Sequence, residues 1–126
     1  MNVGFIGAGH IAQALAEGWS RPGLAAAPRL AFFDIAPEAA AKAAALTGGE
    51  AVGSAAQLVA GADIVIVSVR PQQVEDVLAD IGPHVGARAL VCVAAGVSQA
   101  RLEAALPTGT RVGRVMPNVA AVPAVA

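Results

Sequence analysis

The feature that most constrains the fold is a glycine-rich turn between a short apolar run and a helical pattern, at the start of the chain. The run Asn2–Gly7 is short and apolar enough for a buried β-strand, and His10–Ser20 has apolar residues at helical spacing. The residues that join them, GAGHIA at positions 7–12, match the pattern G-x-G-x-x-G/A. A strand that passes through such a turn into a helix is typical of parallel sheets covered by helices.

The same alternation of apolar runs and alanine-rich helical stretches continues along the chain. Further strands are expected at residues 29–34, 50–52, 63–69, 89–96 and 111–117. Helices are expected at residues 37–46, 55–61 and 98–106, and from Pro71 to an end at Gly82-Pro83. The strands are continuously apolar, which indicates burial on both faces. The sequence therefore predicts one doubly wound α/β domain with a mostly parallel sheet.

Composition narrows the classes of function. The formal net charge of −1 gives no support for a nucleic-acid or acidic membrane partner. The single cysteine, Cys92, excludes an internal disulfide and fits a reducing compartment. No apolar run reaches the roughly 18 residues of a membrane span, and the first residues lack the basic segment of a secretion signal. We therefore expect a cytoplasmic location and no membrane partner.

The glycine pattern predicts a dinucleotide site at the first turn. Gly7 permits the tight turn, Gly9 lets the backbone approach a pyrophosphate, and Ala12 lets the helix pack closely on the sheet. The helix N-terminus adds free N–H groups and a positive dipole for the phosphates. His10 could contact a phosphate or the nicotinamide ribose, but a histidine on a loop surface is more often simply solvated. A plain tight turn without a ligand is the alternative for the motif as a whole.

Asp34 ends the second expected strand, where an acidic side chain can bind the hydroxyls of the adenine ribose. A carboxylate there repels a 2′-phosphate, and no arginine follows it directly. This position therefore favours NAD(H) over NADP(H). The alternative is a solvated aspartate that caps the helix near Pro37.

The remaining reactive side chains form no catalytic set. Cys92 lies within an apolar run, which predicts a buried, inert thiol, and Glu75 and Asp76 are expected to be ordinary exposed charges on a helix. No metal-ligand cluster and no Ser/His/Asp set can be assembled from the sequence. Any catalysis would therefore depend on a cofactor that supplies the reactive atom while the protein positions it.

Four stretches of this chain resemble pyrroline-5-carboxylate reductase: GFIGAGHIAQAL, ADIVIVSVRPQQVEDVL, LVCVAAGVSQARLEAAL and RVMPN, in that family's order and spacing. The glycine loop is generic, whereas the V-[KR]-P, A-A-G-V and M-P-N segments are specific in combination. The resemblance implies a Rossmann-type domain of a reductase in proline biosynthesis. Such an enzyme transfers hydride from NAD(P)H to the cyclic imine 1-pyrroline-5-carboxylate, giving L-proline.

The resemblance also implies a cofactor site made from residues at the ends of strands. The glycine loop would hold the pyrophosphate, the turn at residues 69–71 would line the cofactor groove, and residues 95, 96 and 118 would lie near the nicotinamide. With Asp34, the expected cofactor-binding residues are Gly7, Gly9, His10, Ile11, Ala12, Asp34, Val69, Arg70, Pro71, Ala95, Gly96 and Asn118. No residue is assigned with certainty as catalytic, although Asn118 would lie close to the substrate.

The chain departs from the family at three places, one of which is Asp34, an unusual residue for relatives that use NADPH. His10-Ile11 stands where the family usually has Asn-Met, and Val119-Ala120 stands where Thr-Pro usually follows M-P-N. The change at residues 119–120 removes a hydroxyl group near the expected imine site.

The resemblance places a dinucleotide-binding domain at residues 1–118 and the start of an interdomain segment at residues 119–126. In the family a helical domain follows, dimerises and completes the active site, so we expect these residues alone to bind cofactor but to catalyse feebly. The low charge and the apolar end favour self-association into a homo-oligomer. Two alternatives stay open: another NAD(P)-dependent reductase, such as a deazaflavin-linked NADP oxidoreductase or a hydroxyacid dehydrogenase, and a non-catalytic, redox-sensing dinucleotide-binding module.

Overall fold

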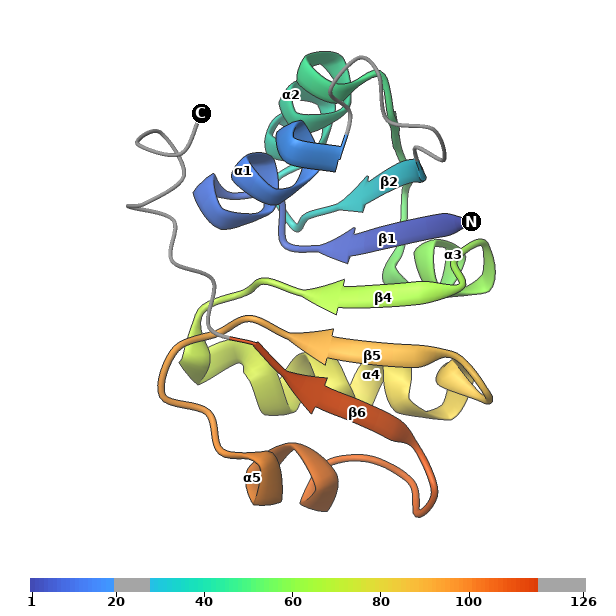
Figure 1. Cartoon of the computed structure of the whole chain (residues 1–126), viewed down its shortest axis with the longest axis vertical. Helices are drawn as coiled ribbons and strands as arrows, with labels where there is room; N and C mark the ends of the chain where they lie inside the picture. The colour runs from blue at the N-terminus through green and yellow to red at the C-terminus, as the bar shows by residue number, and fades with distance from the viewer. Residues whose placement is uncertain (20–27, 116–126) are drawn as a thin grey trace.

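A computed structural model describes residues 1–19 and 28–115 of the chain. Their six strands form one parallel sheet in the order β3-β2-β1-β4-β5-β6 (Figure 1). The strands are β1 (Asn2–Ile6), β2 (Arg29–Phe33), β3 (Glu50–Ala51), β4 (Ile64–Val67), β5 (Ala89–Cys92) and β6 (Arg111–Arg114). The helices are α1 (His10–Trp19), α2 (Pro37–Thr47), α3 (Ala55–Ala60), α4 (Val74–Val85) and α5 (Gln99–Ala104), with a 3-10 turn η1 (Pro71–Gln73). The prediction of a doubly wound parallel sheet is confirmed.

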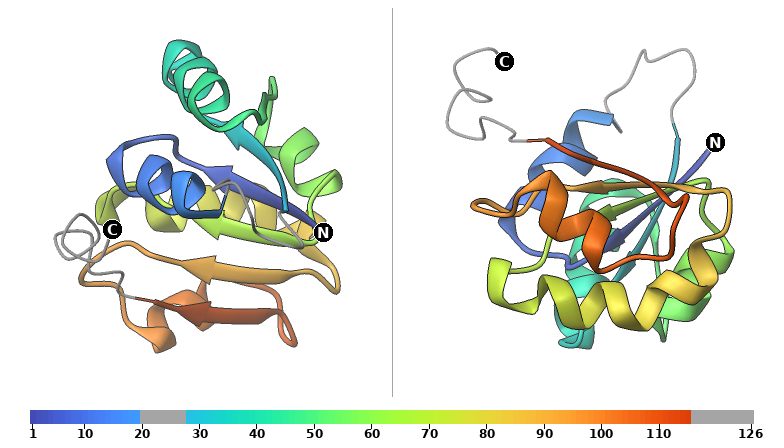
Figure 2. Two further views of the ribbon diagram at one scale, coloured as in Figure 1. Left: turned by 45° about the horizontal axis from the view of Figure 1, so that its top comes forward. Right: turned by 90° about the horizontal axis from the view of Figure 1, so that it is seen from below.

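Helices cover the two faces of the sheet in separate layers. Side chains of α1 and α2 form one apolar cluster with β1 and β2, whereas those of α3, α4 and α5 form a second cluster with β4 and β5. Figure 2 shows the layers from two further sides. The chain returns to the middle of the sheet after β3, so β4 pairs with β1. These two strands lie side by side although 57 residues stand between them in the sequence (64 − 6 − 1).

Alanines form the buried side of α1. Ala12 and Ala16 of this helix and Ala8 before it are completely buried, and they belong to the same apolar cluster as side chains of β1 and β2. A methyl group fills little space, so these positions leave room for larger side chains of the strands. On the same face the rings of Phe5 and Phe32 stack with their centroids 5.1 Å apart. Large aromatic side chains of the strands and small methyl groups of the helix therefore fill this layer together.

The expected end of α4 at Gly82-Pro83 is wrong, because the helix continues to Val85. Proline normally disfavours a helical residue before it, since its ring clashes with that residue's Cβ atom. Gly82 has no Cβ atom, and a Cβ built there would lie only 3.2 Å from Cδ of Pro107. The last turn is also anchored by Val85, which is completely buried in the core. Tertiary packing therefore outweighs the local signal.

The strands are shorter than predicted at their carboxyl ends. β4 ends at Val67 and β5 at Cys92, and the residues that follow them form the turns in which several expected site residues lie. The last expected strand begins at Arg111 as predicted, and its final residues, 116 and 117, lie outside the described part of the chain. Among the described residues, no helix has the length and apolar character needed to cross a membrane.

Candidate functional site

A cleft of about 650 Å³ lies where the winding of the sheet reverses, beyond the carboxyl ends of β1, β2 and β4. This is the position at which open parallel sheets bind ligands, because the loops diverge there. One helix, α4, supplies the outer wall with one of its faces. The residues around the cleft are Ile6, Gly7, Gly9, Phe33, Asp34, Ile35, Ala36, Ala55, Ser68, Val69, Arg70, Gln73, Asp76, Val77 and Asp80.

Gly7 makes the sharp turn out of β1, and its neighbours leave no room for a side chain. Its φ angle is +94°, a conformation that favours glycine. A Cβ atom at this position would lie 2.8 Å from the backbone oxygen of Ser68. The turn is also hydrogen-bonded on both sides: Gly7 N donates to Phe33 O at 2.8 Å, and Ser68 Oγ donates to Gly7 O at 2.6 Å.

Gly9 differs from Gly7 because nothing in the described structure occupies the space beside it. It is exposed, and a Cβ atom built on it would have no heavy atom within 4 Å. It directly precedes α1, whose first turn carries no acidic side chain. The N-terminus of a ten-residue helix, with its unpaired N–H groups and positive dipole, thus faces an unobstructed approach. This arrangement suits a phosphate group.

Asp34 stands at the end of β2 and is half-buried. Its Oδ2 accepts a hydrogen bond from Ala8 N at 2.8 Å, and its Oδ1 accepts one from Ala36 N at 2.9 Å. It is not the cap of α2, because that position is Ala36 and no side-chain cap bond is present. A carboxylate has about four acceptor sites, so about two stay free for hydroxyl donors.

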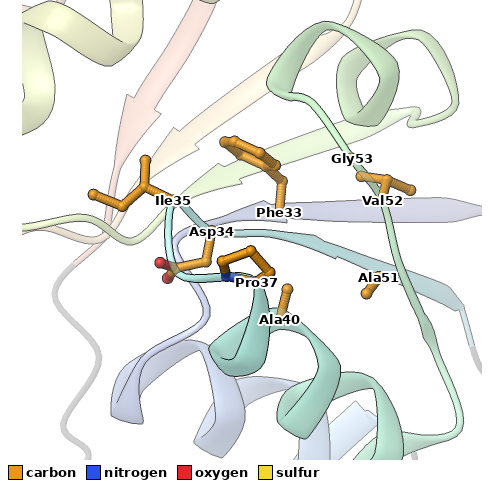
Figure 3. A pocket seen from close by; sticks show the side chains of 8 residues that line it. All are labelled: Phe33, Asp34, Ile35, Pro37, Ala40, Ala51, Val52 and Gly53. Atoms are coloured by element: carbon orange, nitrogen blue, oxygen red, sulfur yellow. The ribbon is translucent and has the colours of Figure 1, made fainter.

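A smaller hollow of about 300 Å³ lies on the other side of the Asp34 region, between the end of β2, the start of α2 and β3 (Figure 3). Its lining is Phe33, Asp34, Ile35, Pro37, Ala40, Ala51, Val52 and Gly53. Asp34 is the one charged residue of this lining and it is shared with the larger cleft. The hollow therefore offers an apolar surface and no cation.

The turn after β4 is held by a second layer of contacts. Gln73 Oε1 accepts from Arg70 N at 3.3 Å, and Arg101 Nη2 donates to Pro71 O at 2.9 Å. Arg101, on α5, also forms an ion pair with Glu75 of α4, and this hydrogen bonding lowers the pKa of the Glu75 carboxyl group. Glu75, which was expected to be an ordinary exposed charge, thus links α4 to α5. Arg70, which is exposed, is the single cation among the residues that line the cleft.

The structure brings together only part of the predicted site. Gly7, Gly9, Asp34, Val69 and Arg70 line one cleft. The other expected residues do not line it. His10 is exposed at the start of α1, Ile11 of the same helix is half-buried, and Ala12 is completely buried. Pro71 is half-buried in the turn, and Ala95 and Gly96 are exposed after β5. Asn118 lies outside the described residues.

Sequence reasoning missed several residues of the cleft wall. Gln73 lines it from the end of η1, and Asp76, Val77 and Asp80 line it from α4. Their spacing of i, i+3, i+4 and i+7 marks one helix face, which is a usable signal, although it does not reveal what that face meets. Ser68 was missed because a serine after a strand has no distinctive pattern. Across residues 1–19 and 28–115 the structure contains no group of three His, Cys, Asp or Glu side chains that could hold a metal ion.

Comparison with known proteins gives relatives over nearly the whole chain. The pyrroline-5-carboxylate reductase of Methanosarcina acetivorans is 36% identical over 120 residues, which cover 94% of this chain and 44% of the relative. That of Pseudomonas aeruginosa is 38% identical over 120 residues, with the same coverage of 94% and 44%. The chain therefore spans less than half the length of these relatives.

A solved structure and a family model agree with the fold. The Plasmodium falciparum pyrroline carboxylate reductase, crystallised with NADP bound, superposes with a TM-score of 0.82 at 23% identity, over 98% of this chain and 44% of that one. Residues 2–96 match the family model described as NADP oxidoreductase, coenzyme F420-dependent. The chain thus belongs to this NADP oxidoreductase family, as a Rossmann-type domain similar to the N-terminal part of pyrroline-5-carboxylate reductases.

Proposed function

We propose that the cleft binds a nicotinamide dinucleotide and that the chain forms the cofactor-binding part of a reductase of the pyrroline-5-carboxylate type. The observation that carries this proposal is the open space beside Gly9 at the N-terminus of α1. A pyrophosphate can approach the backbone there, and the helix dipole favours its charge. The names of the relatives and the NADP in the Plasmodium falciparum structure support the same ligand class.

The residues of the cleft would each meet a different part of the cofactor. The glycine turn, Gly7 and Gly9 with the start of α1, would hold the pyrophosphate. Asp34 would accept hydrogen bonds from the adenine ribose, and Val69 and Arg70 would border the adenosine end. Ala95, Gly96 and Asn118 stay assigned to the nicotinamide end by family resemblance. The cofactor supplies a hydride, and the protein orients it toward the electrophilic carbon of a C=N bond.

We further infer a preference for NAD(H) over NADP(H). Two acceptor sites left on Asp34 match the two hydroxyl donors of an unmodified ribose, whereas a 2′-phosphate removes one donor and adds negative charge. The lining of the cleft contains three carboxylates, Asp34, Asp76 and Asp80, against one cation, Arg70. The hollow beside Asp34 adds no cation that could hold a phosphate.

The reaction that we propose is reduction of 1-pyrroline-5-carboxylate to L-proline, with hydride added to the imine carbon and a proton taken up by nitrogen. The relatives are more than twice as long as this chain, so the imine would be bound with the help of residues beyond the cofactor domain, which we place at residues 1–118. Segment 119–126 would then lead toward that second part. The chain alone should bind the cofactor but reduce the imine only slowly.

The first experiment is a calorimetric titration of the purified chain with NADH and with NADPH. Tighter binding of NADH supports both the cleft and the preference. Equal or reversed affinities refute the preference and leave the cleft standing, whereas no binding of either refutes the cleft. For the reaction, residues 1–118 would replace the matching part of the Pseudomonas aeruginosa relative, and NADH oxidation by 1-pyrroline-5-carboxylate would be followed. Binding without turnover in this hybrid favours a dinucleotide-binding module over a reductase.

A further inference from the structure

Three backbone groups of the glycine turn are fixed by the ends of the neighbouring strands. Gly7 N donates to Phe33 O of β2, and Gly7 O accepts from Ser68 Oγ beyond β4. The next amide, Ala8 N, donates to the Asp34 carboxylate at 2.8 Å. The peptide that joins Gly7 to Ala8 is therefore held at its oxygen from one side and at its nitrogen from the other.

The Asp34 contact joins residues that are 26 positions apart in the sequence. One carboxylate oxygen points to the turn after β1, while the other accepts from Ala36 N at the entrance to α2. Ala8 is itself completely buried, so water has poor access to its amide should the carboxylate be lost. A buried N–H without a partner is costly, and the peptide would rotate to find one.

We propose that Asp34 is a positioning residue for the glycine turn: its carboxylate sets the orientation of the Gly7–Ala8 peptide and thereby the approach of the dinucleotide phosphates to α1. This inference rests on the proposed function for the ligand, and it adds a role that ribose binding does not include. Charge-assisted bonds of a carboxylate to backbone N–H groups are stronger than neutral ones, which suits this role.

The proposal has a consequence for cofactor preference. If Asp34 served only the ribose, its replacement by a neutral residue would relax selectivity and leave the phosphate site intact. If it also holds the turn, the same replacement weakens binding of both dinucleotides. Asn has one acceptor oxygen, so it cannot accept from Ala8 N and Ala36 N at the two places where the carboxylate oxygens stand.

The test compares Asp34→Asn with Asp63→Asn. Asp63 Oδ2 accepts from Asn2 N at 2.7 Å, so the control removes the charge from the same kind of carboxylate-to-backbone bond, but at the amino end of β1 and away from the cleft. The first readout is hydrogen exchange of the Ala8 amide in the ligand-free protein, followed by NMR. The second is affinity for reduced nicotinamide mononucleotide, which carries one phosphate and no adenine ribose.

We expect D34N to accelerate exchange of the Ala8 amide and to weaken mononucleotide binding, each by about tenfold, as loss of one charge-assisted hydrogen bond implies. D63N should change neither. Wild-type exchange and wild-type mononucleotide affinity in D34N would overturn the proposal. If the wild-type chain binds no nucleotide, the proposed function fails, and the exchange of Ala8 still decides this inference. Should D34N not fold, D34S is measured in its place, since its single oxygen can keep the bond to Ala36 but not also that to Ala8.

Discussion

Two glycines of one motif should respond in opposite ways to the same substitution. Gly7 and Gly9 are separated by a single residue, and the sequence pattern assigns both to the cofactor loop. In the structure the backbone angle and the close neighbours of Gly7 require a glycine there, whereas Gly9 borders open space. We therefore predict that Gly7→Ala lowers the stability of the fold and that Gly9→Ala lowers the affinity for the cofactor.

The cost of Gly7→Ala comes from two sources. An L-residue at the φ angle of +94° found here loses about 1–2 kcal/mol relative to glycine. The new Cβ atom would also lie 2.8 Å from Ser68 O, which is backbone and cannot turn aside as a side chain can. Forcing such a contact costs about 1–3 kcal/mol more. The total of about 2–5 kcal/mol is a large share of a typical unfolding free energy of about 5–15 kcal/mol, and it lowers Tm by roughly 10 °C or more.

Gly9→Ala meets neither penalty. Its φ angle is not positive, and no heavy atom lies within 4 Å of the position of the new methyl group. At such sites Gly→Ala often stabilises a protein by about 0.4–1 kcal/mol, because the unfolded chain loses freedom. The methyl group, however, fills the space through which a pyrophosphate would approach. We expect at least a tenfold loss of NADH affinity, about 1.4 kcal/mol.

Urea denaturation followed by circular dichroism measures the first effect, and calorimetric titration with NADH measures the second. Gly9→Ala serves as the control for the stability measurement, since its fold should be at least as stable as that of the wild type. A Gly7→Ala protein as stable as the wild type would refute the steric account of the turn. A Gly9→Ala protein that binds NADH with unchanged affinity would show that the phosphates lie elsewhere.

Three further predictions concern charge and pH. The double variant D76N/D80N should bind NADPH a fewfold more tightly relative to NADH, because it removes two negative charges from the cleft wall; unchanged relative affinities in parallel titrations would contradict this. Burial raises the pKa of the Cys92 thiol, so alkylation of this thiol at pH 8 should be slow in the native protein and fast in urea. For the same reason the free energy of unfolding should fall as the pH rises above the usual thiol pKa of about 8.5. Hydrogen bonding to Arg101 lowers the pKa of Glu75, so E75Q should be less stable than the wild type at pH 7, with the difference disappearing as the pH falls below the ordinary glutamate pKa of about 4.3.

Features fixed by local chemistry could be predicted from the sequence. The apolar run before Gly7 and the helical spacing after it predict β1 and α1, and both are present. Ser54 and Ser98 directly precede α3 and α5, where serine is a common helix cap, and each accepts a hydrogen bond from the backbone N–H three residues on. The position of Asp34 at the end of β2 also follows from the apolar pattern. In each case the signal and its effect lie within a few residues.

Features that depend on distant packing could not be predicted in this way. The continuation of α4 through Pro83 depends on Gly82 lying against Pro107, which is 25 residues away in the sequence (107 − 82). The hydrogen bond from Ala8 N to Asp34 depends on the pairing of β1 with β2 and on the register of that pairing. A pattern shows that an aspartate ends a strand, but it does not show which amide that carboxylate will accept.

The acidic face of α4 illustrates why the same residues support two interpretations. Asp76 and Asp80 are exposed and stand four positions apart, which in sequence is the pattern of a solvated helix face. Whether such a face meets bulk water or a ligand depends on the ends of β1 and β2, which lie opposite it and come from the first 36 residues of the chain. The negative charge of the wall is therefore a property of the assembled sheet. This explains why Asp34 was found by its place in a strand, whereas its two companions became visible only when the fold placed the three carboxylates around one cleft.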